Sequence, residues 1–153
     1  MTDPMTSIDS AKFTLAQRIR TVMITGRIVL GVAMMVSPTR ATRLYLGHDA
    51  TRPGLRYYVR IAGGREIVLA ISQHTAIGYP TLRRGALVLG SLFDLWDAAD
   101  AIATRGLSPR GRLIAATTSL TWALLGAAAA QLDPDTTDAT ARSVDPPVAA
   151  RHA

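Results

Sequence analysis

The apolar residues of this chain gather into four segments, which are separated by loops rich in glycine, proline and arginine. The segments cover residues 21–36, 57–73, 85–103 and 113–132. Ser37-Pro38 ends the first segment and Asp133-Pro134 ends the last, because proline cannot continue a helix and restrains the residue before it. The pattern predicts an all-α chain in which four helices are joined by short loops.

The last segment, residues 113–132, is the clearest candidate for a membrane span. It carries no charge, and its length matches the roughly 20 residues that a helix needs to cross the hydrocarbon core. The second and third segments hold three charges each, and a charge at the centre of a lone span costs roughly 2.5–3.5 kcal/mol. We therefore expect these two segments to insert only with partners. A soluble four-helix bundle is the alternative, but the uncharged last segment favours a four-helix transmembrane bundle.

Three regions follow from this pattern. We expect a polar N-terminal segment at 1–20, a four-helix membrane domain at 21–132 and a disordered polar tail at 133–153, which is rich in Pro, Thr and Asp. Residues 1–20 contain no apolar stretch followed by a small-residue cleavage site, so we expect no removable signal peptide. Four spans place both ends on one side of the membrane, but the arginines are too evenly distributed to fix the orientation.

The composition agrees with a membrane location. Charged residues make up only 18 % of the chain and the mean hydropathy is +0.20, which suits a small membrane protein with its polar residues in short loops. The net charge of +6 comes from arginines scattered along the chain, and aromatic residues make up only 5 %. Nucleic-acid binders instead cluster their basic residues on one face. We therefore expect no nucleic-acid partner and assign the loop arginines to an anionic lipid surface.

Seven charged residues lie inside the apolar segments: Arg27, Arg60, Arg65, Glu66, Asp94, Asp97 and Asp100. Short loops make neighbouring helices antiparallel, so residue counting matches the depths of these charges in the bilayer. The matched depths predict three ion pairs: Arg27 with Glu66, Arg65 with Asp94, and Arg60 with Asp100 or Asp97. We expect these side chains to form a buried ionic network or ligand site between the helices, because lipid exposure would be costly.

The Gly63-Gly64 pair lies in the same segment as three of these charges. Glycine has no side chain, so a neighbouring backbone can approach closely there. We expect both glycines to narrow the bundle where the charges meet.

The acids of the network outnumber its arginines by one. We therefore expect one acid to carry a proton, and Asp97, which is central in the aspartate stripe, is the candidate. Two interpretations stay open. The network fixes the register of the helices, or it handles a proton or a ligand, since a buried ionisable group is costly to keep without a function.

The sequence contains few patterns that indicate a metal or cofactor site. The aspartates could offer oxygen ligands to a hard cation, but the nearby arginines compete for the same carboxylates, so we predict no metal. The chain has no cysteine, which excludes disulfides and thiolate sites. It also shows no phosphate-binding glycine loop, dinucleotide fingerprint or nucleophile elbow. We predict no cofactor, and the balance favours a protein that is not an enzyme.

Three motifs in this order are familiar: RIVLG followed by SP, then RIAGGREIVL, then DLWDAAD. Across residues 27–132 the chain resembles a family of small bacterial integral membrane proteins of unknown function, which is distantly similar to DoxX-type four-helix proteins. The resemblance implies a multi-pass protein of the bacterial inner membrane. Because DoxX-type proteins are associated with membrane redox complexes and quinones, it also implies a quinone as a candidate ligand.

Three functions remain as hypotheses. The first is an accessory subunit that binds a lipid or another small hydrophobic ligand, alone, as a homo-oligomer or in a membrane complex. The second is a small proton-coupled transporter in which Glu66 and the aspartate stripe titrate. The third is a quinone-binding accessory of a membrane redox complex.

Overall fold

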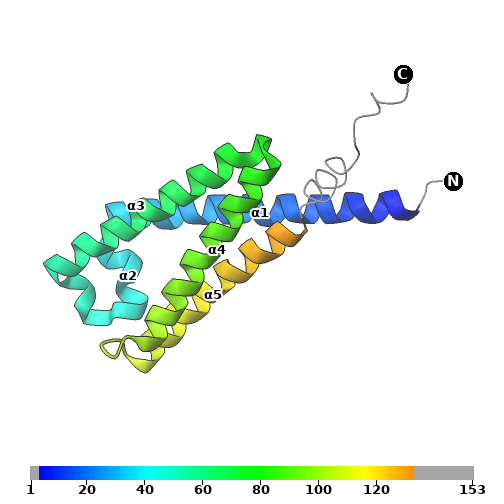
Figure 1. Ribbon diagram of the computed structural model, residues 1–153. Helices are drawn as coiled ribbons and strands as arrows, with labels where there is room; N and C mark the ends of the chain where they lie inside the picture. The colour runs from blue at the N-terminus through cyan, green and yellow to red at the C-terminus, as the bar shows by residue number, and fades with distance from the viewer. Residues whose placement is uncertain (1–3, 133–153) are drawn as a thin grey trace, which may run out of the picture.

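The computed structural model describes residues 4–132, and its regular structure in this range is entirely helical (Figure 1). The elements are α1 (Pro4–Val36), α2 (Pro38–Leu46), the 3₁₀ turn η1 (Gly47–Thr51), α3 (Pro53–Thr75), the 3₁₀ turn η2 (Ala76–Gly78), α4 (Pro80–Ala103) and α5 (Pro109–Gln131). The prediction of an all-α chain is confirmed for these residues. The tail predicted at 133–153 lies outside them.

The four predicted segments correspond to α1, α3, α4 and α5, and α2 with η1 occupies what was predicted to be the first loop. Proline stands at the start of each of the five helices, where its missing N–H is not needed and its fixed φ suits the first turn. Helix α1 is 33 residues long. The boundary predicted at residue 20 therefore lies inside a continuous helix.

The long helices pack as two pairs. Helix α1 packs along α3, and α4 packs along α5. The two pairs are joined by η2 between α3 and α4, and these two helices diverge from that turn (Figure 1). Helix α2 and the connection between α4 and α5 lie at the opposite end of the bundle from η2 (Figure 1). We call this opposite end the α2 end.

Small residues hold each pair together. Between α1 and α3, Gly63 lies against Gly31, and a Cβ atom at Gly63 would stand 2.7 Å from the Gly31 carbonyl oxygen. Gly64 has open space where its Cβ would be, so only the first of the two predicted glycines narrows the bundle. Between α4 and α5, Gly126 packs on Ser91 and on the backbone of Leu87. In both pairs, the absence of a side chain at glycine allows the two helix backbones to approach closely.

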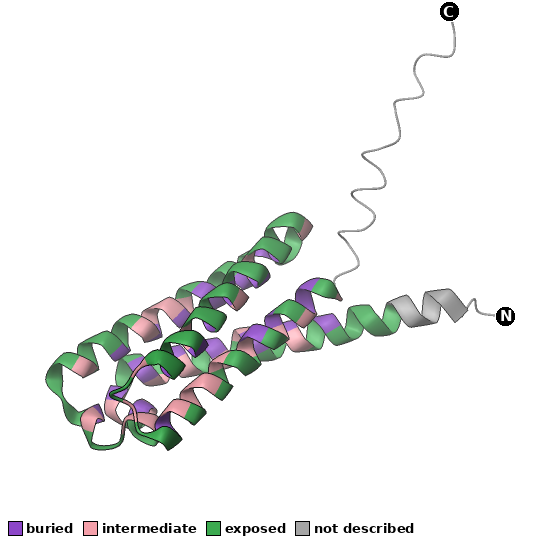
Figure 2. Ribbon diagram, turned by 60° about the horizontal axis from the view of Figure 1, so that its bottom comes forward, coloured by how far each residue is buried: buried purple, intermediate pink, exposed green. Residues whose placement is uncertain are grey.

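Many large apolar side chains lie on the outer surface of the long helices. Exposed residues cover much of each long helix (Figure 2), and large hydrophobic side chains are prominent among them, including Val29, Val68, Leu89, Leu92, Trp96 and Leu124. The buried apolar residues are fewer and are mostly alanines. One cluster of them consists of Met23, Leu87, Ala129 and Ala130, with a few half-buried neighbours. Within the part of the chain that the structure describes, two helices are long and apolar enough to cross a membrane by length and composition: α1 over Ser10–Val36, and α5 over Pro109–Gln131.

Candidate functional site

Arg27 is the centre of the charged interior. It lies on α1 with 1 % of its side chain exposed, between Glu66 of α3 and Asp94 of α4. Its Nη1 donates to Glu66 Oε2 over 2.5 Å, and its Nη2 donates to Asp94 Oδ2. The guanidinium also lies 5.8 Å from the ring centroid of Trp122 on α5, within the range of a cation–π interaction. One side chain thus connects all four long helices.

Arg65 on α3 forms the second centre. Its Nη1 donates to Asp97 Oδ1 over 3.0 Å, and its Nη2 donates to Asp97 Oδ2. The same Nη2 lies 3.1 Å from Glu66 Oε1. A bidentate arginine–carboxylate pair combines two parallel hydrogen bonds and fixes both side chains in orientation. About a third of the Arg65 and Asp97 side chains is exposed, so this part of the site lies nearer the surface of the bundle.

These five side chains make one continuous chain of contacts, which we call the ionic cluster: Asp94, Arg27, Glu66, Arg65 and Asp97. It contains three carboxylates and two guanidinium groups, so it carries one excess negative charge when every group is ionised. Glu66 and Asp97 use both of their oxygens in these contacts. Asp94 uses only Oδ2.

The predicted pairing was right for one pair. Arg27 and Glu66 meet as expected. The pairing of Arg65 with Asp94 was wrong, because Arg27 binds Asp94 and Arg65 binds Asp97. Residue counting assumed that neighbouring helix axes stay at a constant separation and that each charge has one partner. In the structure α3 and α4 diverge, and the several N–H donors of one guanidinium engage two carboxylates.

The predicted third pair is also wrong. Arg60 is exposed, and its Nε donates to the backbone oxygen of Met35 over 3.2 Å. Asp100 is exposed as well, and neither residue takes part in the ionic cluster.

Asp97, which we expected to carry the proton, has both oxygens bound by Arg65. Asp94, with one oxygen outside these hydrogen bonds, fits that role better.

Gln73 is one of the interior polar residues that the sequence did not reveal, together with Arg20, Thr42 and Arg83. It is 1 % exposed, and within residues 4–132 neither atom of its side-chain amide has a hydrogen-bond partner. Its Nε2 packs over Gly90, on the same side as the Arg27 guanidinium. Gln73 follows Glu66 by seven residues and therefore shares its helix face, a spacing that could have drawn attention to it.

The carboxylate oxygens of Glu66, Asp94 and Asp97 approach within 4.8 Å of one another. Such a spacing could suit a cation, but Arg27 and Arg65 already engage most of these oxygens. The arrangement is chemically suited to two tasks. Its ion pairs can hold α1, α3 and α4 together, and it can keep one proton on an acid whose two oxygens do not both accept hydrogen bonds from the arginines.

The chain matches no family model, no curated protein and no solved structure. The resemblance to DoxX-like membrane proteins therefore stays a prediction, and the function has to be argued from the geometry.

Proposed function

We propose that this chain is a multi-pass protein of the bacterial inner membrane, in which α1, α3, α4 and α5 cross the bilayer as a four-helix bundle. In this proposal it acts as a small accessory subunit that binds lipid or a lipid-like ligand. The ionic cluster holds the helices together inside the hydrocarbon.

The observation that carries the proposal is the inverted polarity of the bundle. In a water-soluble helical protein the most apolar helices are mostly buried. Here only 33 % of the apolar window of α1 and 22 % of that of α5 is buried inside the fold, while Arg27, Glu66 and Asp94 are buried. Apolar side chains facing outward and paired charges facing inward are what a lipid solvent requires.

The ionic cluster also explains how α3 and α4 could enter a bilayer. Each carries charges that disfavour insertion of a lone helix. Pairing neutralises most of these charges between the helices, and a buried pair retains its attraction where the dielectric constant is low. Both helices would thus cross the membrane as partners of α1 and not as independent spans.

Cysteine accessibility tests this arrangement, since the chain has no native cysteine. Leu92 is exposed in the middle of α4, and Gly106 is exposed in the connection between α4 and α5. In membranes opened to both sides, Leu92→Cys should resist a water-soluble maleimide while Gly106→Cys reacts. Equal labelling of the two variants would show that the outer face of α4 contacts water, and the proposal would fail.

A second candidate function, proton-coupled transport, is favoured by the carboxylate excess of the ionic cluster and by the Asp94 oxygen that takes no part in the cluster's hydrogen bonds. The direct test is proton movement into vesicles that contain the purified protein and a trapped pH dye, with an imposed membrane potential. We expect Asp94→Asn to abolish the movement and the matched exposed variant Asp100→Asn to leave it unchanged. Wild-type vesicles that acidify no faster than protein-free vesicles would exclude this function.

A further inference from the structure

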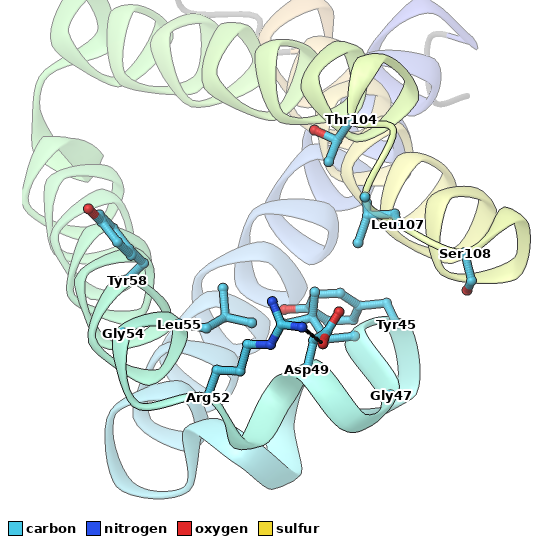
Figure 3. A pocket seen from close by; sticks show the side chains of 12 residues that line it. Tyr45, Gly47, Asp49, Arg52, Gly54, Leu55, Tyr58, Thr104, Leu107 and Ser108 are labelled. Atoms are coloured by element: carbon cyan, nitrogen blue, oxygen red, sulfur yellow. Dashed lines mark ion pairs between the residues drawn. The ribbon is translucent and has the colours of Figure 1, made fainter.

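A pocket of about 690 Å³ opens at the α2 end of the bundle (Figure 3). Its walls come from the end of α2, from η1, from the start of α3 and from the connection between α4 and α5. It is separate from the ionic cluster: Arg52 lines it from the N-cap position of α3 and Leu55 from the first turn, and none of its lining residues belongs to the cluster. The ionic cluster does not account for it.

Most of the polar side chains that line this pocket can donate hydrogen bonds, although much of its wall is apolar. Arg52 points into it and pairs with Asp49 over 2.9 Å (Figure 3). The side chains of this pair are 73 % and 46 % exposed, and such exposed pairs contribute little to stability. A stronger anionic partner can therefore replace Asp49 at low cost. Gly54 also lines the pocket, in the first turn of α3, where backbone N–H groups have no partner within the helix.

Tyr45 adds a hydroxyl that stays protonated. It lines the pocket from α2, and burial raises the pKa of its phenol to about 12. Its hydroxyl is therefore a hydrogen-bond donor at every physiological pH. Thr104 and Ser108 line the opposite wall with further hydroxyl groups (Figure 3).

The surroundings of the pocket are strongly basic. Among the described residues, seven arginines and two acids lie at the α2 end: Arg40, Arg43, Arg52, Arg56, Arg105, Arg110 and Arg112, with Asp49 and Asp100. Such a concentration of positive charge attracts anions. The pocket is also partly apolar, because Leu55 and Leu107 project into it from α3 and from the connection between α4 and α5 (Figure 3).

We propose that this pocket binds the phosphate-bearing headgroup of an anionic phospholipid, and that Arg52 exchanges Asp49 for the phosphate. The donors and the basic surroundings select the anion, and the leucines accommodate the adjoining glycerol and first methylene groups. The proposal rests on the proposed membrane location, which puts the α2 end at a bilayer surface, where such headgroups lie.

The test is binding of a short-chain phosphatidylglycerol to the full chain purified in detergent, measured by native mass spectrometry and compared with phosphatidylcholine of the same chain length. Arg52→Ala should weaken phosphatidylglycerol binding about fivefold, as expected for one arginine near an anionic lipid. Asp49→Asn should strengthen it, because the competing carboxylate is removed. Arg84→Ala is the matched control, since it removes an exposed arginine from the other end of the bundle.

Opposite effects of Arg52→Ala and Asp49→Asn, with Arg84→Ala unchanged, support the site. If Arg52→Ala and Arg84→Ala weaken phosphatidylglycerol binding equally, the effect comes from the net charge of the protein and the proposal is overturned. Two other outcomes would also overturn it: soluble glycerol phosphate that binds as tightly as the lipid, or a short-chain quinone that displaces it. These outcomes are independent of the cysteine-labelling result, so failure of this site and failure of the membrane proposal can be told apart.

Discussion

Replacement of Arg27 by methionine tests how much the charged interior contributes to the fold. Arg27→Met keeps a long flexible side chain but leaves Glu66 and Asp94 buried without their common cation. Removing one partner of a buried ion pair costs about 3–5 kcal/mol, because the remaining charge is uncompensated. Glu66 retains its contact with Arg65, so we expect the lower part of that range, which corresponds to at least a hundredfold change in the unfolding equilibrium.

The measurement is unfolding in mixed micelles with a rising fraction of denaturing detergent, followed by tryptophan fluorescence. Trp122 lies beside the Arg27 guanidinium, and a Trp96→Phe background makes it the single reporter. Arg60→Met is the matched control. Arg60 is exposed and donates one hydrogen bond to Met35, so its loss should cost about 1 kcal/mol or less.

A third variant separates charge from packing. Arg27→Met combined with Glu66→Gln and Asp94→Asn removes the stranded charges together with the cation, and most of the lost stability should return. If Arg27→Met costs no more than Arg60→Met, burial of the charge contributes little to the fold. If the triple variant is as unstable as Arg27→Met, the loss comes from packing, and the electrostatic reasoning is refuted.

Three further outcomes are expected. Gly63→Ala should destabilise the protein by about 1–3 kcal/mol, because its Cβ would stand 2.7 Å from the Gly31 oxygen. Gly64→Ala has open space at its Cβ and should be neutral or slightly stabilising. The same detergent titration compares the two variants. Gln73→Met should leave stability unchanged or raise it, since the buried amide has no hydrogen-bond partner within residues 4–132. A loss above about 1 kcal/mol would mean that the amide does have a partner. Burial raises the Tyr45 pKa from 10.0 to about 12, so stability from its neutral form should be present below pH 10 and lost as the pH rises toward 12. The same detergent titration, repeated across this pH range, measures the loss, and Tyr45→Phe should remove it.

The four long helices could be predicted from the sequence, because continuous apolar runs and the Ser37-Pro38 break mark them directly. The start of α1 could not, since polar residues predominate over residues 4–20 and they contain no continuous apolar run. Helix α2 was missed for a similar reason. It is only nine residues long and begins with proline, and it holds two arginines before its apolar end, which resembles a loop.

The pairing of charges was predicted in part. Depth along a helix follows from counting, and this was sufficient for Arg27 and Glu66. The choice between Asp94 and Asp97 depends on how far α3 and α4 diverge and on the reach of each arginine side chain. Neither quantity is encoded in residue spacing.

The chain order of the ionic cluster bears on how the protein is made. Arg27 is translated first, then Arg65 with Glu66, and the aspartates of α4 come last. Under the membrane proposal, each acidic group therefore leaves the ribosome after the cation that will neutralise it. A nascent chain halted before α4 would keep Arg65 without Asp97 and Arg27 without Asp94, and such an incomplete product would be a ready target for quality-control proteases.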